Sequence, residues 1–261
     1  MFHSPTDVAF HILGFPVYFY GIILAVSVLV GVVCSEFLYK KFYDNNGSLT
    51  ILDIAPWLMF TGIIGARLYY CLLNFEYYFT NPIEIFSIRQ GGLSIHGMLL
   101  SGILVLFVIA KIYKLSFLKF SDCLLCAMPL AQSIGRWGNF FNSEAFGTPT
   151  NLPWKLFIPV QNRPLEYLDY SFFHPTFLYE SLLDFLIFVI LYIFFKKCYK
   201  SSGVISCLYL ILYGIVRVLV EFLRIDSACY ILGVSVAIWI SGFMVLIGLV
   251  GLFVLKQRQK I

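Results

Sequence analysis

The chain has 261 residues, of which 60% are hydrophobic and only 12% are charged, and its mean hydropathy is +0.87. A soluble domain of this length needs far more charged side chains to solvate its surface, so the composition excludes an ordinary soluble protein. The formal net charge of +4 reflects basic residues between apolar segments, and nothing in it indicates nucleic-acid binding.

Apolar runs long enough to cross a bilayer, which takes about 20 residues in an α-helix, recur along the chain. We therefore predict an all-α, polytopic integral membrane protein that forms a single membrane domain over residues 1–261. Its seven expected spans are 18–38, 51–73, 93–113, 117–134, 176–195, 203–223 and 233–255. In the fourth span, Asp122 interrupts the apolar run.

The basic residues predict the orientation of these helices. Eleven of the eighteen Lys and Arg residues follow the odd-numbered spans: Lys40, Lys41, Lys111, Lys114, Lys119, Lys196, Lys197, Lys200, Lys256, Arg258 and Lys260. Because cytoplasmic connections carry an excess of Lys and Arg, we expect the C-terminus inside and the N-terminus outside. The first 17 residues contain no Lys or Arg and so lack the basic start of a signal peptide. We therefore expect the first span to be retained.

The longest stretch outside the expected spans, residues 136–174, lies on the outer side in this topology. It opens within the polar sequence GRWGNFFNSE, residues 135–144. Alternating side chains over 154–158 predict a short strand or hairpin on the membrane surface. The predicted cytoplasmic connections are short and basic and contain no candidate catalytic or binding motif. We therefore expect the functional surface to face outward.

Ionisable side chains inside the spans are energetically expensive and are functional candidates for that reason. They are Arg67, His96, Glu180, Asp184, Arg217 and Glu221. A helix rises about 1.5 Å per residue, which places all of them except Asp184 near the outer ends of four helices. Asp184 lies deeper, near the midplane, and the sequence indicates no role for it.

Each of these residues also has a purely structural interpretation. Arg217 and Glu221 are four residues apart on one helix and can pair with each other. Arg67 can extend to the headgroups, and His96 can pack between helices. Their shared depth instead favours a cavity in the outer leaflet that binds an anionic headgroup, because an arginine grips phosphate oxygens at two points.

The sequence GRWGNFFNSE supplies further groups for such a cavity. Gly135 and Gly138 allow the backbone to approach closely. Asn139 and Asn142 are neutral donors, and Glu144 can orient an arginine or accept a proton.

Of the seven cysteines, only Cys123 and Cys126 have the spacing of a redox or metal site. They lie in an apolar helix with no second pair and no nearby His. We expect them to be packing residues, and the sequence implies no metal and no cofactor.

Together with Gly147, the sequence GRWGNFFNSE resembles the signature of the bacterial prolipoprotein diacylglyceryl transferases. The resemblance covers nearly the whole chain, because further landmarks of that family follow in the same order. They are Tyr20-Gly21, Gly65-Ala66-Arg67, GGLSIHG at 91–97, His174-Pro175-Thr176, Leu178-Tyr179-Glu180 and RVLVEFLR at 217–224. The chain departs from the family pattern at Met98 and at Ile225-Asp226, which puts local geometry in question rather than the charged groups.

The resemblance implies a reaction and its partners. The family transfers the diacylglyceryl group of phosphatidylglycerol to the lipobox cysteine thiol of a prolipoprotein signal peptide, at the bacterial cytoplasmic (inner) membrane, and releases glycerol phosphate. Because the nucleophile comes from the second substrate, the chain needs no nucleophilic Ser or Cys of its own. A thiol needs a base or a cationic site to become a thiolate.

The resemblance also implies the site residues. The catalytic residues would be His96, Arg136, Arg217, Tyr20, Asn139 and Glu144. The residues that bind phosphatidylglycerol would be Arg136, Arg217, Arg67, Asn142, Glu221 and Gly147. Among them, we expect His96 to accept the thiol proton, the arginines to hold the phosphate, and Glu221 together with Glu180 to orient the arginines.

Two other classes of function fit parts of the sequence. A transporter or channel for an anionic solute also needs Arg and Glu within the membrane, but it predicts inverted repeats and helices broken near the midplane. The sequence contains no repeat, and its polar groups gather at one face. A structural scaffold leaves GRWGNFFNSE unexplained.

Overall fold

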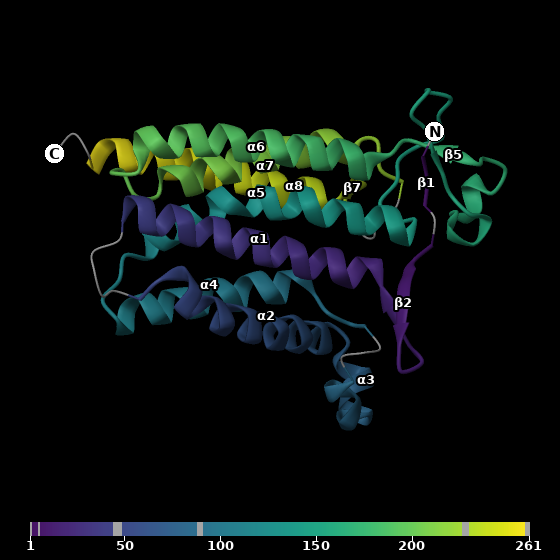
Figure 1. The fold of residues 1–261 in the computed structure, drawn as a ribbon, viewed down its shortest axis with the longest axis horizontal. Coiled ribbons are helices and arrows are strands. Elements are labelled where there is room, and N and C mark those ends of the chain that lie inside the picture. Colours follow the sequence, from purple (N-terminus) through teal and green to yellow (C-terminus); the bar gives the residue numbers. More distant parts are fainter. Residues whose placement is uncertain (1, 5, 44–48, 88–90, 226–229, 259–261) are drawn as a thin grey trace. The chain divides into compact units, whose positions relative to one another are not determined.

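A computed structural model describes residues 2–4, 6–43, 49–87, 91–225 and 230–258 (Figure 1). Asp226, at which the chain departs from the family pattern, and Lys260 of the basic tail lie outside the described residues. The chain divides into two compact units. Unit 1 comprises Met1–Ser35 and Ser121–Ile261, and unit 2 comprises Glu36–Phe120.

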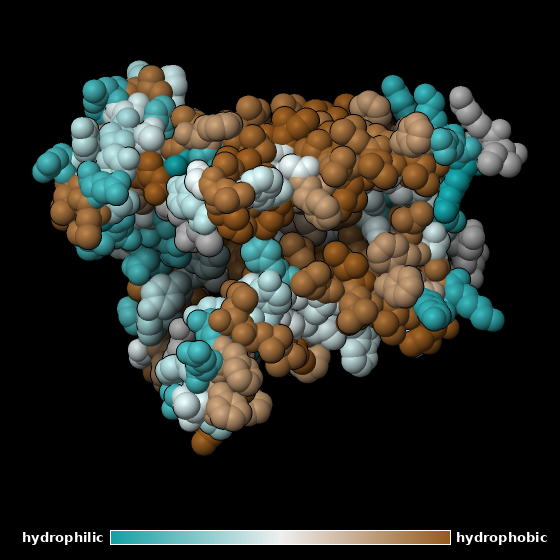
Figure 2. All heavy atoms as spheres, turned by 180° about the vertical axis from the view of Figure 1, so that it is seen from behind, coloured by the Kyte–Doolittle hydropathy of each residue, from teal (hydrophilic) through white to brown (hydrophobic). Residues whose placement is uncertain are grey.

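The described residues contain seven helices that are long and apolar enough to cross a membrane. They are α1 (Phe19–Phe42), α2 (Ile51–Leu73), α4 (Ile95–Ile112), α5 (Phe117–Asn142), α6 (Thr176–Cys198), α7 (Val204–Glu221) and α8 (Val236–Arg258). Apolar side chains cover the middle of the helices, and hydrophilic side chains gather toward the helix ends (Figure 2). The predicted all-α, polytopic membrane fold is confirmed.

The fourth helix extends beyond the span predicted at 117–134. α5 continues to Asn142 and so includes Arg136, the first residue of the predicted outer segment 136–174. In this last part, α5 packs closely against α1: a Cβ on Gly138 would lie 2.8 Å from the ring of Tyr20. It ends where Ser143 adopts a left-handed conformation with a φ of 52°. Much of GRWGNFFNSE is therefore presented by a rigid helix and not by a loop.

Asp122 remains within α5 because its carboxylate caps another helix. The buried side chain accepts hydrogen bonds from the backbone N–H of Gly203 at 2.6 Å and of Ser206 at 2.8 Å, and from the Ser206 hydroxyl at 2.6 Å. These donors lie at the start of α7, where unpaired N–H groups favour a negative charge. The residue that interrupts the apolar run thus links α5 to α7.

In unit 2, α2 and α4 pack closely because both carry small residues where they meet. A Cβ on Gly65 would lie 2.7 Å from the carbonyl oxygen of Gly97, so glycine is needed for this approach. The Ser94 N–H donates to the carbonyl of Ala66 at 3.0 Å and ties the start of α4 to α2. Two short helices connect them: α3 (Phe75–Thr80) and the 3-10 helix η1 (Pro82–Phe86).

Short strands lie at the end of unit 1 where α5 ends and α6 begins, which we call the strand end (Figure 1). They form a sheet in the order β1-β4-β5, in which β4 is parallel to β1 and antiparallel to β5. Their bounds are β1 (Phe2–His3), β4 (Leu156–Phe157) and β5 (Phe172–Phe173). The strand predicted within 154–158 is confirmed as β4.

Two hairpins of unit 1 lead directly into membrane-spanning helices. The first precedes α1 and the second precedes α8, and in both pairs the strands are antiparallel. The strands are β2 (Val8–Ile12) and β3 (Phe15–Tyr18), then β6 (Tyr230–Ile231) and β7 (Val234–Ser235).

A small apolar core fixes the segment between α5 and α6. Its buried members are Phe146, Leu156, Ile158, Phe173 and Phe177. Burial of each such side chain stabilises the fold by about 1.5–3 kcal/mol. Phe146 follows α5 and Phe177 lies in the first turn of α6, so this core holds the two helix ends in place at the strand end.

Candidate active site

Six charged side chains at the strand end of unit 1 form what we call the arginine–carboxylate cluster. They are Arg136 on α5, Glu180 and Asp184 on α6, Arg217 and Glu221 on α7, and Arg224 after α7. The three acidic side chains are only 2–3% exposed and the three arginine side chains 14–19%. Because charges withdrawn from water are unfavourable unless they are paired, the cluster depends on its mutual contacts.

Arg136 is held between two carboxylates that lie one turn apart on α6. Its Nη1 is 2.7 Å from Oε2 of Glu180, and its Nε is 3.5 Å from Oδ2 of Asp184. Its Nη2 donates a hydrogen bond to the hydroxyl of Tyr213 on α7 at 3.5 Å. The three guanidinium nitrogens therefore face three different side chains, which together set the plane of the group.

Arg217 pairs with Glu221 one turn later on α7, with 2.7 Å between Nη2 and Oε2. The helix pair considered from the sequence is thus present, but it engages only one side of the guanidinium. Nη1 of Arg217 lies 3.7 Å from Oε1 of Glu180 and, although buried, makes no hydrogen bond within the described part of the chain. A buried donor of this kind is unfavourable until an acceptor reaches it.

The two glutamates connect the arginines to one another and to the second hairpin. Glu180 contacts all three arginines, because its Oε1 also lies 3.3 Å from Nη1 of Arg224. Oε1 of Glu221 accepts a hydrogen bond from the hydroxyl of Ser235 on β7 at 2.6 Å. The orientation of each arginine therefore depends on residues of α6, α7 and β7.

Gly147 brings the chain after α5 beside Arg224. The two residues form an antiparallel β-bridge, and the Thr148 N–H donates to the carbonyl of Leu223 at 2.9 Å. A Cβ on Gly147 would lie 2.7 Å from that carbonyl oxygen, so a larger residue would force the segments apart. Arg224 was not among the predicted site residues. The signal that could have identified it is its place at the end of RVLVEFLR.

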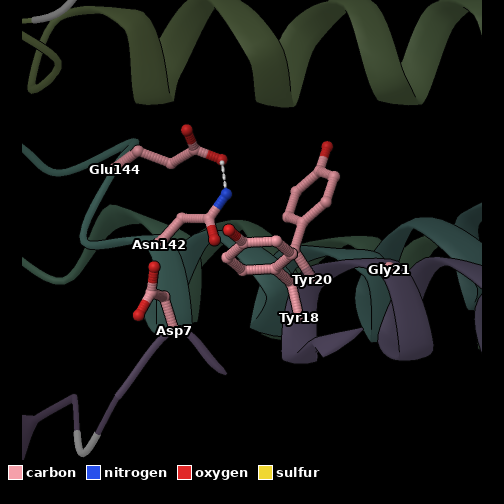
Figure 3. A pocket seen from close by; sticks show the side chains of 6 residues that line it. All are labelled: Asp7, Tyr18, Tyr20, Gly21, Asn142 and Glu144. Atoms are coloured by element: carbon pink, nitrogen blue, oxygen red, sulfur yellow. Dashed lines mark hydrogen bonds between the residues drawn. The ribbon is translucent and has the colours of Figure 1, made fainter. Parts of the chain in front are cut away.

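A polar cavity of about 480 Å³ also opens in unit 1. It is lined by Asp7, Tyr18, Tyr20, Gly21, Asn142 and Glu144. Figure 3 shows the carboxylate of Glu144 beside the amide of Asn142, with the rings of Tyr18 and Tyr20 next to them. Oε1 of Glu144 accepts hydrogen bonds from Nδ2 of Asn142 at 3.3 Å and from Nδ2 of Asn139 at 3.0 Å.

Helix α5 carries residues of both the cavity and the arginine–carboxylate cluster. Arg136 and Asn139 are three residues apart and so are neighbours on its surface, and the amide of Asn139 donates to Glu144, which lines the cavity. The ring of Tyr20 packs against Gly138 of the same turn. A volume of about 480 Å³ lies within the usual range for small-ligand sites. The cavity can therefore hold a small polar group, and α5 supplies residues both to its lining and to the arginine–carboxylate cluster.

Arg67, in unit 2, is buried, with 5% of its surface exposed. Its five N–H donors face five backbone carbonyls. These belong to Glu84, Ile85, Ser87, Gly91 and Gly92, at 2.6–3.4 Å. Because a guanidinium has no sixth donor, contact with a phosphate requires Arg67 to release a carbonyl. Through these contacts, Arg67 anchors the segment before α4.

His96 lies in the first turn of α4, in unit 2, and is exposed there. Its ring centroid is 6.2 Å from that of Tyr69. Within the described part of unit 2, no hydrogen bond engages its imidazole. A ring nitrogen is therefore open to a proton donor.

The structure also describes the cysteine pair considered in the sequence. Cys123 and Cys126 are fully buried free thiols, which fits packing residues. Across the described ranges, no group of three or more His, Cys, Asp and Glu side chains is arranged to hold a metal ion.

Fold and site together define a polytopic membrane protein in which partly buried arginines, paired with buried carboxylates, lie at one end of the unit 1 helices. Comparison with known proteins identifies the particular family. The model of the prolipoprotein diacylglyceryl transferase family matches residues 7–254, and the chain belongs to this family.

Individual relatives are similar over almost their full length. A phosphatidylglycerol–prolipoprotein diacylglyceryl transferase of Synechococcus sp. (strain CC9902) is 43% identical over 272 residues, which cover 100% of this chain and 96% of the relative. Proteins of the same name from Prochlorococcus marinus (strain MIT 9312) and Thermotoga maritima are 43% and 42% identical. Those alignments cover 98% and 96% of this chain, and 94% and 85% of the relatives.

Proposed function

We propose that this protein transfers the diacylglyceryl group of phosphatidylglycerol to the lipobox cysteine of a prolipoprotein signal peptide and releases glycerol phosphate. Membership of the family supports this reaction, and the relatives' names state both substrates. The structural observation that carries it is the buried Nη1 of Arg217, a donor without a hydrogen bond among the described residues, in a cluster with two further arginines.

The reaction requires that negative charge be stabilised on a leaving phosphate. The thiolate sulfur attacks the glycerol CH₂ next to the phosphate, and a C–S bond forms while the C–O bond breaks. The electron pair leaves on the phosphate oxygen, and the thiol proton passes to a base. Fixed guanidinium groups stabilise the departing oxygen most strongly in the transition state, which lowers the barrier.

Different residues of unit 1 bind the phosphate and orient the groups that bind it. Arg136 and Arg217 hold the phosphate, and Glu180 and Glu221 orient the two arginines through the ion pairs at 2.7 Å. Gly147 supports Arg224 through the backbone bridge.

The polar cavity then receives the uncharged part of the headgroup. Tyr20, Asn142 and Glu144 line it and supply hydrogen-bonding groups, and the amides of Asn139 and Asn142 donate to Glu144. The open imidazole of His96 accepts the thiol proton. Arg67 anchors the segment that leads to His96 and binds lipid only if it exchanges a carbonyl for a phosphate oxygen.

The reaction is tested with purified protein, phosphatidylglycerol labelled in its acyl chains and a lipobox peptide. We expect a diacylglyceryl thioether on the peptide cysteine and glycerol phosphate in equal amounts. A peptide with Ser in place of the lipobox Cys is the matched control and should remain unmodified. Transbilayer movement of an anionic solute without any bond exchange would support the transporter hypothesis in its place.

The proposed site faces outward from the bacterial cytoplasmic (inner) membrane, with the N-terminus outside and the C-terminus in the cytoplasm. The bias of Lys and Arg toward one side supports this orientation. A membrane-impermeant thiol reagent applied from outside should label a cysteine introduced within residues 150–165. It should not label a cysteine introduced beside Lys197. The reverse labelling pattern would contradict the orientation.

A further inference from the structure

Asp184 is a member of the arginine–carboxylate cluster to which the proposed reaction assigns no role. It lies one turn beyond Glu180 on α6, and its side chain is 2% exposed. Within the described ranges, Arg136 is the cation within ion-pair distance of this carboxylate. A buried carboxylate of this kind is unfavourable unless it is paired, so its interaction with Arg136 must offset a large loss of hydration.

Asp184 cannot itself act on the phosphate group. A carboxylate repels a phosphodiester, and Asp184 lies deeper along α6 than Glu180, which already contacts Nη1 of Arg136. Its effect must therefore pass through the guanidinium. Asp184 faces Nε, Glu180 faces Nη1, and the hydroxyl of Tyr213 faces Nη2.

These three contacts leave some N–H groups of Arg136 available to a substrate. A guanidinium has five N–H groups: one on Nε and two on each Nη. The Tyr213 hydroxyl accepts a hydrogen bond from Nη2, whereas Glu180 and Asp184 approach Nη1 and Nε as ion pairs without a hydrogen bond. N–H groups on both Nη1 and Nη2 are therefore left for a substrate. Two parallel donors are what bidentate recognition of a phosphate requires.

We propose that Asp184 is a positioning residue whose ion pair with Nε of Arg136 turns the Nη donors toward the leaving phosphate. This inference rests on the proposed function, in which Arg136 holds that phosphate. Without the carboxylate, the guanidinium can rotate about its remaining contacts, and misplacement by about 1 Å can lower a rate by roughly 10²-fold.

The substitution Asp184→Asn separates positioning from simple binding. It removes a negative charge near an anion site, so the KM for phosphatidylglycerol should stay unchanged or fall. Loss of orientation in the transition state should lower kcat by about 10²-fold. Asp184→Glu retains a carboxylate and should restore part of kcat. A normal kcat in Asp184→Asn, or a raised KM with an unchanged kcat, would overturn the proposal.

Asp122→Asn is the matched control, because it also removes a buried carboxylate from unit 1 but one that caps α7. It should lower the thermal unfolding midpoint and leave kcat and KM per folded molecule unchanged. If Asp184→Asn behaved in the same way, Asp184 would be only structural, which would contradict the proposal.

A double substitution tests whether Asp184 acts through Arg136. In an Arg136→Lys background, Asp184→Asn should have little further effect on kcat, because the group that it positions is already absent. Independent, multiplicative losses would contradict the proposal. Failure of the proposed function is distinguishable, since in that case the unmodified protein would form no thioether with the lipobox peptide.

Discussion

Arg136→Lys should lower kcat/KM for phosphatidylglycerol by about 10²–10³-fold, although the positive charge is kept. Lys has no planar fork, so it cannot face Glu180 and Tyr213 and still present two parallel donors to a phosphate. We expect most of the loss in kcat, because the charge on the leaving oxygen develops in the transition state. The measurement is a steady-state assay with labelled lipid and lipobox peptide.

Arg258→Lys provides the matched control for this experiment. Arg258 is the last residue of α8, is exposed, and lies outside the arginine–carboxylate cluster. The same substitution there should leave kcat and KM unchanged, and both variants should insert into the membrane. A normal kcat with a raised KM for Arg136→Lys would make Arg136 an anchor for the headgroup and not a group that stabilises the transition state.

His96→Gln should lower activity at neutral pH by about 10²-fold or more and change the shape of the pH profile. An imidazole accepts a proton near neutral pH, whereas the Gln amide keeps hydrogen bonding but cannot act as a base. At higher pH the lipobox thiol, whose ordinary pKa is about 8.5, ionises without help. The variant should therefore recover part of its activity as the pH rises, and rates measured across this range test the prediction.

The alternative role of His96 makes a different prediction. If the arginines alone generate the thiolate and His96 only packs, His96→Gln keeps the rate and the pH profile of the unmodified protein. His11→Gln is the control, since His11 is exposed on β2 and has no place in the proposed mechanism. Its profile should match that of the unmodified protein, which shows that loss of a histidine is not sufficient to produce the change.

The all-α membrane fold was predictable because the hydropathy of a span is a local property of about 20 consecutive residues. For the same reason, the strand at Leu156–Phe157 could be predicted from local alternation. The family could be identified from GRWGNFFNSE and the landmarks around it, and the comparisons confirm it. The catalytic role of His96 stays a prediction.

Local polarity sets the end of the predicted fourth span at residue 134, whereas α5 continues as a helix to Asn142. A helix continues through polar residues when its neighbours accept them, and here the ring of Tyr20 lies against Gly138. That contact joins residues more than a hundred positions apart, so no local window of the sequence contains it. It packs the turn of α5 that follows Arg136 against α1.

The pairing of charges likewise depends on packing that no local pattern encodes. Hydropathy shows that Arg67 and Arg136 are expensive to bury, but not which acceptors satisfy them. In the folded chain, Arg67 is engaged by five carbonyls, whereas Arg136 meets Asp184, a residue for which the sequence indicated no role. A guanidinium has a fixed number of donors with fixed directions. Packing brings some side chains and carbonyls within about 3 Å of each guanidinium. These neighbours decide how many of its donors remain available to a substrate.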